Sequence, residues 1–556
     1  MQRLLLLVVL LLHPATPTII RTAHGRVQGS EVTTSTGTLV HEFYELPFAV
    51  PPLGDLRWTH STLWTEEWGG VRNATTTSET KCVQGPSDNA TVEVKGGEDC
   101  LRLTVRTPNT TGSLPVMVWI HGGSLRVGWA EEPGYAPDAE LTADLRAVTV
   151  NINYRLDVLG FLTTHDLGDD QGNYGTGDAL TALRWVRENI ASFGGDPTTV
   201  TVLGESSGAT VIYGLLAADE ADGLFSRAIL LSGPPKLVTT PKIASNLRSS
   251  FTADVGCKQK SPAKRLACLR RASTNVLASK FYSDTKGWGF YDFPYGFKGE
   301  EGESMDYAVL DSTLITTSPA GLRNKTRRSK VDLYISNTAQ ETGYNYMYCK
   351  TNIVYSWSDA ITLLMRKMIT LTHEFPSVNK TFPKSAINDI AAEYGWNKTA
   401  DDWWPQLFID SIFTDVRTTC INNDLVVNLN ENEAITARRV YISQRADELH
   451  DPGTGEGLVR WSAFHGWDTE GLFGYGYYKP TTAGEVHQQR FTRNLRDFVG
   501  AVVRDEVGEG EWSVGETLHF TNDDFPGGLK LSEELPQAEK CEMWRRWDML
   551  QFGWEN

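Results

Sequence analysis

The amino-acid sequence predicts an α/β protein with a large, mostly parallel central sheet and helices on both faces. Apolar runs of strand length alternate with a helical pattern, and glycine-rich turns separate them. The segment Leu114–Ile120 is an apolar run between Gly112 and Gly122, as expected for a strand that is buried on both faces. Ala147–Asn153 has the same character and predicts a second such strand.

The next elements continue this alternation. Residues 178–191 predict a helix, because apolar side chains recur there at helical spacing. Thr199–Leu203 predicts a strand, a helix follows through Leu216, and Ala228–Leu231 predicts another strand. Strands that alternate with helices favour a parallel sheet covered on both faces.

The composition is that of a globular protein. The 556 residues are 40% hydrophobic and 22% charged, which excludes a disordered chain, a collagen-like chain and a small disulfide framework. The formal net charge of -17 would repel a phosphate backbone, so nucleic acid is not expected as a partner. No repeat or low-complexity linker marks a boundary, and residues 19–556 are interpreted as one domain.

The first residues have the pattern of an export signal. Arg3 supplies a positive charge, Leu4–Leu12 is an unbroken apolar run, and Pro14 ends it before a stretch of small residues. The run is far shorter than the roughly 20 residues that cross a bilayer. Residues 1–18 therefore predict a signal peptide, and the mature protein is expected to be secreted and to have no membrane span.

Glycosylation sequons and cysteines agree with export. The sequons place Thr two residues after Asn73, Asn89, Asn109, Asn324, Asn379 and Asn397. Seven cysteines fit an oxidising compartment, although sequence alone does not fix their pairing. The pairs that spacing suggests are Cys82 with Cys100, Cys257 with Cys268, and Cys420 with Cys541. Cys349 is then left over, either as a buried thiol or as an intermolecular link.

The turn Gly204-Glu-Ser-Ser-Gly208 carries the first chemical signal. It lies between a predicted strand and a predicted helix, where a sharp turn thrusts Ser206 outward and leaves no room for side chains two positions away. The start of the helix offers the N–H of Ser207 to a developing oxyanion. An ordinary Gly/Ser turn is the structural alternative, but the flanking elements favour a nucleophile.

A second glycine turn follows the strand Leu114–Ile120. In His121-Gly122-Gly123-Ser124, the two glycines let consecutive backbone N–H groups approach a substrate oxygen without a Cβ in the way. Taken alone, this is equally well a strand-ending turn. The chain has no Cys-x-x-Cys and no His-Glu-x-x-His pattern, so neither a metal site nor a cofactor is expected.

These turns and several other segments resemble the type-B carboxylesterase and cholinesterase family of α/β-hydrolases. The segments that carry the resemblance are Leu46–Gly54 with Leu56–Trp58, Glu98–Leu103, Asn153–Arg155, Gly160–Leu162, Gly172–Gly175 and Phe193–Pro197. The resemblance implies an α/β-hydrolase fold and a serine esterase that acts on a small-molecule ester through an acyl-enzyme intermediate.

The resemblance also implies the rest of a triad. Asn337–Gly343 is similar to the family's acid loop, which makes Glu341 the orienting carboxylate. Phe464–Gly466 is similar to its histidine loop, which makes His465 the general base. Without the resemblance, Glu341 would be taken as a surface acid, and other histidines also follow it in the chain. These are His373, His450, His487 and His519.

Supporting residues are implied in the same way. Gly122 and Gly123 are expected to bind the oxyanion together with Ser207 or Ala209. Buried ion pairs are implied for Arg57 with Glu98 and for Arg155 with Asp178, and Ser232 is implied to lie near the triad. The chain departs from the family where Ser124 and Leu125 replace a glycine and an aromatic residue, and where Ser207 replaces an alanine.

The loop between Cys82 and Cys100 bears on the substrate. It contains no aromatic residue, whereas a cholinesterase holds quaternary ammonium there by cation–π attraction with a tryptophan. The loop is also shorter than a lipase lid. A non-specific or hormone-type carboxylesterase therefore fits this loop better than a cholinesterase or a lipase with a lid, and a more specialised lipase or hormone esterase is kept as an alternative. A non-catalytic adhesion or binding ectodomain is the alternative of another class, and the ester and the oligomeric state are left open.

Overall fold

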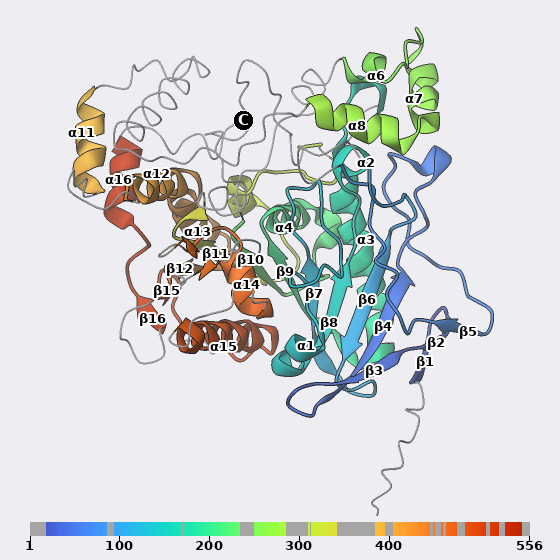
Figure 1. The fold of residues 1–556 in the computed structure, drawn as a ribbon, viewed down its shortest axis with the longest axis horizontal. Helices are drawn as coiled ribbons and strands as arrows, with labels where there is room; N and C mark the ends of the chain where they lie inside the picture. Colours follow the sequence, from blue (N-terminus) through green and yellow to red (C-terminus); the bar gives the residue numbers. More distant parts are fainter. Residues whose placement is uncertain are drawn as a thin grey trace, which may run out of the picture.

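The computed structural model describes residues 18–85, 94–167, 172–233, 250–284, 310–311, 313–341, 384–394, 404–444, 449–450, 457–459, 463–474, 484–507, 512–521 and 529–546. Within these residues, an eleven-stranded sheet has the order β16-β15-β12-β11-β10-β9-β7-β8-β6-β4-β3. The run from β15 to β8 is parallel, and the strands at both ends pair antiparallel. Figure 1 shows this order as a change of colour across the sheet, from blue N-terminal to red C-terminal strands.

The strands of the large sheet are β3 (Ser30–Thr33), β4 (Leu39–Pro47), β6 (Arg102–Thr107), β7 (Leu114–Ile120), β8 (Val148–Ile152), β9 (Gly195–Glu205), β10 (Arg227–Leu231), β11 (Val331–Thr338), β12 (Ile435–Ile442), β15 (Thr517–Phe520) and β16 (Leu529–Ser532). A small three-stranded sheet contains β1 (Ile19–Thr22), β2 (Gly25–Gln28) and β5 (Val71–Asn73). A two-stranded sheet contains β13 (Leu449–His450) and β14 (Gly457–Val459). The predicted strands correspond to β7, β8, β9 and β10, so the predicted sheet is confirmed.

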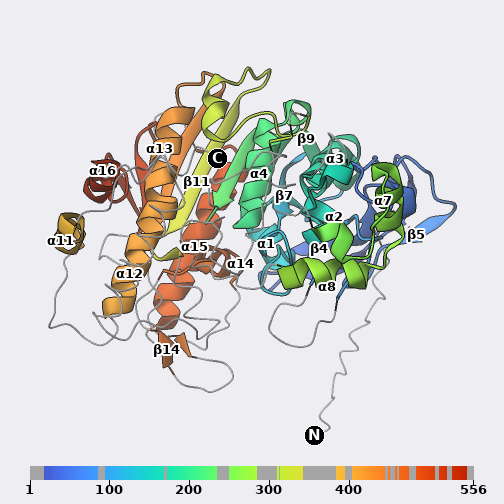
Figure 2. The ribbon, with the colours of Figure 1, turned by 90° about the horizontal axis from the view of Figure 1, so that it is seen from above.

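The helices are α1 (Ala139–Leu145), α2 (Asp157–Phe161), α3 (Tyr174–Asn189), α4 (Ser207–Ala217), α6 (Phe251–Asp254), α7 (Pro262–Arg271), α8 (Thr274–Asp284), α11 (Lys384–Glu393), α12 (Trp404–Thr414), α13 (Cys420–Leu429), α14 (Trp467–Phe473), α15 (Gly484–Val503) and α16 (Ala538–Arg546). A π-helical segment, Asp415–Thr419, joins α12 to α13. Helices α7 and α8 lie beside α2 in both views (Figure 1, Figure 2).

Alternating side chains of the strands feed two cores. On one face, Val118 and Val202 pack with α3, α4 and α13. On the other face, Trp119 and Leu203 pack with α1, α14 and α15. Successive side chains of a strand point to opposite faces, so a strand covered on both sides must be apolar at nearly every position. This explains the unbroken apolar runs in the sequence.

Disulfides and ion pairs join separate segments of the chain. The structure joins Cys82 to Cys100, Cys257 to Cys268, and Cys420 to Cys541, which are the pairs suggested by spacing. The two implied ion pairs are also present, with an N–O distance of 2.6 Å in both Arg57–Glu98 and Arg155–Asp178. The described residues contain no helix that combines the length and the apolar character needed to cross a membrane.

Several predicted features fall outside the described residues. These are residues 1–17 of the signal peptide, the sequons at Asn89, Asn379 and Asn397, and Cys349. The three described sequon asparagines, Asn73, Asn109 and Asn324, are exposed. The predicted helix of residues 178–191 starts four residues after the observed one, because α3 begins at Tyr174. The first turn of α3 is buried on nearly every side, so it shows no periodic pattern that would predict a helix.

Candidate active site

The turn between β9 and α4 holds Ser206 in a strained backbone conformation. Its φ and ψ are 53° and -120°, outside the regions that a residue with a side chain normally adopts. A Cβ on Gly204 would lie 2.7 Å from the backbone of Gly208, and a Cβ on Gly208 would collide with the carbonyl oxygen of Ile120. The Ser206 N–H donates to the Leu231 carbonyl at 2.9 Å, which holds the turn against β10. Close contacts with neighbouring backbone atoms therefore restrict positions 204 and 208 to glycine.

Gly122 and Gly123 lie beside this turn, directly after β7. A Cβ on Gly122 would lie 3.2 Å from the Ser206 Cβ and would collide with a carboxylate oxygen of Glu205. Gly123 has a φ of +104°, and a Cβ there would collide with the Val127 carbonyl oxygen. Both glycines are partly exposed, so their backbone remains accessible next to the serine.

The start of α4 adds further N–H groups. In the first turn of a helix these groups have no partner within the helix, and they carry the positive end of its dipole. The first bond of this kind runs from Thr210 N to Ser206 O at 3.2 Å. Ser207 and Ala209 therefore lie in the first turn of α4, where the backbone N–H groups have no partner within the helix, as an oxyanion site requires. Both residues are buried.

Glu341 and His465 are brought together from distant parts of the chain. The Glu341 Oε2 lies 2.6 Å from His465 Nδ1, and Thr338 N donates to Glu341 Oε1 at 2.6 Å. Gln340 ties the two loops together, because its N–H donates to the Ala463 carbonyl and its Oε1 accepts from Ala463 N, each at 2.9 Å. The acid loop and the histidine loop are thus fixed to each other at two points.

The imidazole lies next to the serine turn through Glu205. His465 Nε2 is 3.2 Å from Glu205 Oε1, and both side chains are buried. Burial by itself lowers the pKa of His465, but the hydrogen bond and charge of Glu341, with the charges of Glu205 and Asp468, raise it to about 9. Burial raises the pKa of Glu205 to about 8, against the attraction of His465.

A further carboxylate completes the surroundings of the imidazole. Ser232 Oγ donates to Asp468 Oδ2 at 2.7 Å, which links the residue after β10 to the helix that follows His465. Burial and the charge of Glu341 raise the pKa of Asp468 to about 6. Ser232 therefore contacts the surroundings of His465 through Asp468, which agrees with its implied position.

A buried arginine supports the acid loop from behind. Arg439 is fully buried on β12, and its guanidinium donates to Asn337 Oδ1, to Asn423 Oδ1 at 3.0 Å and to the Ile335 carbonyl at 2.9 Å. Asn337 in turn donates to the Thr338 carbonyl at 2.7 Å. The positive charge of Arg439 therefore lies next to the end of β11, the strand that Glu341 follows.

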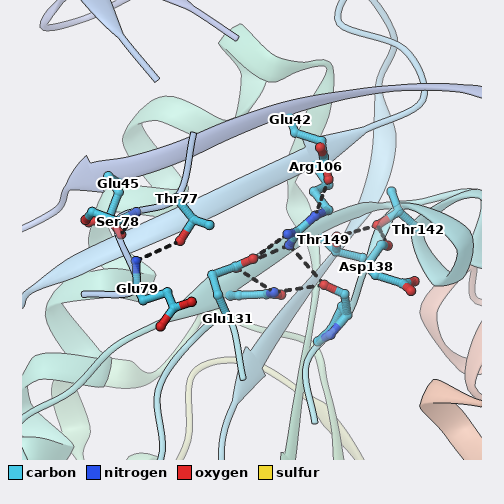
Figure 3. A network of polar contacts seen from close by, with 12 residues as sticks. Glu42, Glu45, Thr77, Ser78, Glu79, Arg106, Glu131, Asp138, Thr142 and Thr149 are labelled. Atoms are coloured by element: carbon cyan, nitrogen blue, oxygen red, sulfur yellow. Dashed lines mark hydrogen bonds and ion pairs between the residues drawn. The ribbon is translucent and has the colours of Figure 1, made fainter. Parts of the chain in front are cut away.

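The loop after the glycines is anchored by a second buried arginine, shown in Figure 3. Arg106 lies between Glu42 and Glu131, with Nε 2.8 Å from Glu42 Oε1 and Nη1 3.2 Å from Glu131 Oε1. Asn151 also donates to Glu131 at 3.0 Å, and Arg106 donates to the Pro137 carbonyl at 2.9 Å. Two strands of the sheet thereby hold the segment that leads from the glycine turn to α1.

Four residues of this candidate site were not assigned from the sequence: Glu205, Asp468, Gln340 and Arg439. Glu205 stands in the variable position of the serine motif, and Asp468 follows the histidine loop, so their spacing to Ser206 and His465 was the available signal. Gln340 lies within the acid-loop segment Asn337–Gly343 and Arg439 belongs to no motif, and only the pairing of distant segments reveals the contacts of both. The described residues include no group of three or more His, Cys, Asp or Glu side chains placed to hold a metal ion.

The fold and the strained serine turn are those of an α/β-hydrolase. The chain matches the Carboxylesterase family over residues 16–519, and it belongs to that family. It is 34% identical to liver carboxylesterase 1 of Oryctolagus cuniculus over 349 residues, which are 60% of each chain. It is 31% identical to carboxylesterase 1F of Mus musculus over 408 residues, which are 70% of this chain and 69% of that one. It is 40% identical to carboxylesterase 3 of Homo sapiens over 277 residues, 46% of each chain.

Proposed function

We propose that this protein is a secreted serine carboxylesterase that hydrolyses small-molecule carboxylic esters. Ser206 is the nucleophile, His465 the general base and Glu341 the orienting carboxylate. The observation that carries the proposal is the 2.6 Å contact between Glu341 and His465 beside the strained serine turn. Membership of the Carboxylesterase family and the carboxylesterase relatives support it.

In the first half-reaction, Ser206 Oγ attacks the carbonyl carbon of the ester while His465 Nε2 takes the hydroxyl proton. The carbonyl electron pair moves onto the oxygen, and the N–H groups of Gly122, Gly123 and either Ser207 or Ala209 bind the resulting oxyanion. The oxyanion then collapses, the bond to the alcohol oxygen breaks, and the imidazolium returns its proton to the departing alcohol. The products are an acyl-enzyme and a free alcohol.

In the second half-reaction, water replaces the alcohol. His465 takes a proton from the water as its oxygen attacks the acyl carbon, and the second oxyanion collapses with loss of Ser206 Oγ. The proton returns to Oγ, and the carboxylic acid leaves. The carboxylate of Glu341 stabilises the imidazolium in both half-reactions, because it accepts the hydrogen bond from Nδ1 throughout.

The test compares the secreted chain with its Ser206→Ala variant. A short-chain nitrophenyl ester reports turnover, and an organophosphate reports a reactive serine. The proposal expects turnover and stoichiometric labelling in the parent, with both lost in the variant. A folded parent that neither turns over nor takes up label would refute the enzyme and favour the adhesion or binding ectodomain.

The same proposal covers export and domain organisation. Three disulfides and three exposed sequon asparagines support an oxidising, secretory route, in which residues 1–18 are removed and residues 19–556 form one domain. Removal of N-glycans by an endoglycosidase is expected to lower the apparent mass of the secreted protein. Peptide mapping of Asn73, Asn109 and Asn324 then identifies the occupied sites, and a secreted protein without glycans would contradict this part of the proposal.

A further inference from the structure

The turn that contains the two glycines beside Ser206 is held at both ends by buried hydroxyl groups. Leu125 N donates to Ser207 Oγ at 3.0 Å, and the Tyr154 hydroxyl donates to the His121 carbonyl at 2.7 Å. These two bonds lie after and before the glycines, so together they bracket the turn. Ser207, Tyr154 and Leu125 are buried, and water does not compete for these bonds.

The anchored carbonyls set the direction of the neighbouring N–H groups. In a planar trans peptide, the C=O of one residue and the N–H of the next point in opposite directions. The bond from Tyr154 to the His121 carbonyl therefore turns the Gly122 N–H away from Tyr154. The His121 Nδ1 lies 2.8 Å from the Gly122 carbonyl, and because a carbonyl only accepts, this contact likewise fixes the Gly123 N–H. Each candidate oxyanion donor is thus oriented through the carbonyl of its own peptide.

Two unusual residues follow the glycines and need this support. Ser124 and Leu125 have φ values of 58° and 57°, in the left-handed region that residues with a side chain enter only at a cost. The bond from Leu125 N to Ser207 Oγ holds the second of them in place. These are the positions at which the chain departs from the family pattern, and the departures contact each other.

We propose that Ser207 is a positioning residue whose hydroxyl, together with Tyr154, fixes the turn His121–Leu125 and so sets the geometry of the Gly122 and Gly123 donors. The proposal rests on the function proposed above and adds a role for the residue that follows the nucleophile. The Ser207 hydroxyl transfers no proton and forms no bond with the substrate. It connects the serine turn to the oxyanion turn, so that the two halves of the site keep their spacing.

The first test measures the connection itself and needs no catalysis. Hydrogen–deuterium exchange is compared for the parent, for Ser207→Ala and for a matched control, Ser61→Ala. The Ser61 hydroxyl is also hydrogen-bonded in a part-buried position, to Thr181 at 2.8 Å and to the Gly177 carbonyl at 3.4 Å, but away from the serine turn. The proposal expects faster exchange of the Leu125 amide in Ser207→Ala alone. Unchanged exchange of this amide in Ser207→Ala would overturn the proposal, even in a protein without esterase activity.

The second test separates positioning from simple destabilisation. For a neutral nitrophenyl ester, Ser207→Ala is expected to lower kcat about three- to tenfold, the worth of one hydrogen bond, with KM nearly unchanged. Tyr154→Phe is expected to have a similar effect, and the loss in the double variant is expected to fall short of the product of the two single losses, because both hydroxyls hold one turn. Complete organophosphate labelling and a cooperative urea transition show that each variant is folded.

The outcomes distinguish the two proposals. A parent without turnover or labelling refutes the esterase, and the exchange experiment still decides on the connection. An active parent whose Ser207→Ala variant keeps the full kcat overturns the positioning role while the esterase stands. Label on Ser207 itself in the Ser206→Ala variant would also overturn it, because Ser207 would then be a second nucleophile.

Discussion

The carboxylate next to the nucleophile is expected to control the pH range of activity. Glu205 Oε1 lies 3.2 Å from His465 Nε2, with both side chains buried. Unit charges at this distance attract by about 5 kcal/mol at an effective dielectric constant of ~20, which sets the scale of their coupling. Replacing the carboxylate in Glu205→Gln removes this attraction and keeps the shape of the side chain. The imidazolium loses stabilisation, so the pKa of His465 falls.

The sign and size of the effect follow from the role of the imidazole. His465 accepts a proton only when it is neutral, so kcat/KM decreases as the pH falls through its pKa. An opposite charge this close typically shifts a pKa by about 1–3. The pKa of Glu205 is itself about 8, so much of its charge is already lost at neutral pH. We therefore expect the acid limb of kcat/KM to move down by about one pH unit, the lower end of this range.

The assay is a pH profile of kcat/KM with a neutral nitrophenyl ester, followed at a wavelength where nitrophenol and nitrophenolate absorb equally. Glu220→Gln is the control, because Glu220 is an exposed carboxylate that pairs with Arg184 at the surface. Its profile should coincide with that of the parent. An acid limb in Glu205→Gln that does not move, or that moves to higher pH, would refute the assigned electrostatics of the site.

Three further predictions concern the site and its support. Glu341→Gln removes the carboxylate that holds His465, and kcat is expected to fall about ten-thousand-fold. The melting temperature of the unlabelled variant is expected to stay that of the parent. Gly122→Ala places a Cβ 3.2 Å from the Ser206 Cβ, so kcat should fall about a hundredfold or more, and steady-state kinetics showing parent-like turnover would contradict the oxyanion assignment. Arg106→Met leaves buried carboxylates without their cation, and urea unfolding should reveal a loss of about 3–5 kcal/mol; a loss below 1 kcal/mol would mean that the network contributes little.

The sequence predicted those elements whose burial is complete. The strands β7 and β10 are apolar because both of their faces are covered, and such runs are visible without any partner. The strand β9 extends well before the predicted Thr199, because its first residues lie at a less buried end and carry no apolar signal. The serine turn was predictable because close backbone contacts restrict two of its positions to glycine.

The support behind the acid loop was not predictable, because it depends on strand register. In the parallel pair β11–β12, Ile335 stands opposite Arg439 and Asn337 opposite Tyr441. Arg439 and Asn337 are therefore diagonal neighbours on one face of the sheet, although they are far apart in the chain. A sequence shows that Arg439 is charged, but it does not show that the residue will be fully buried against the acid loop.

The carboxylates around His465 have a consequence beyond the position of the acid limb. The charge of Glu205 raises the pKa of His465, but Glu205 takes up a proton itself at about pH 8. As the pH falls, this protonation removes part of the attraction that favours the imidazolium, so the two groups bind protons with negative coupling. The parent enzyme should therefore lose activity more gradually than a single ionisation allows. Glu205→Gln should both shift the limb and restore the steepness of a single ionisation, and a limb that moves without steepening would mean that Glu205 keeps its charge throughout.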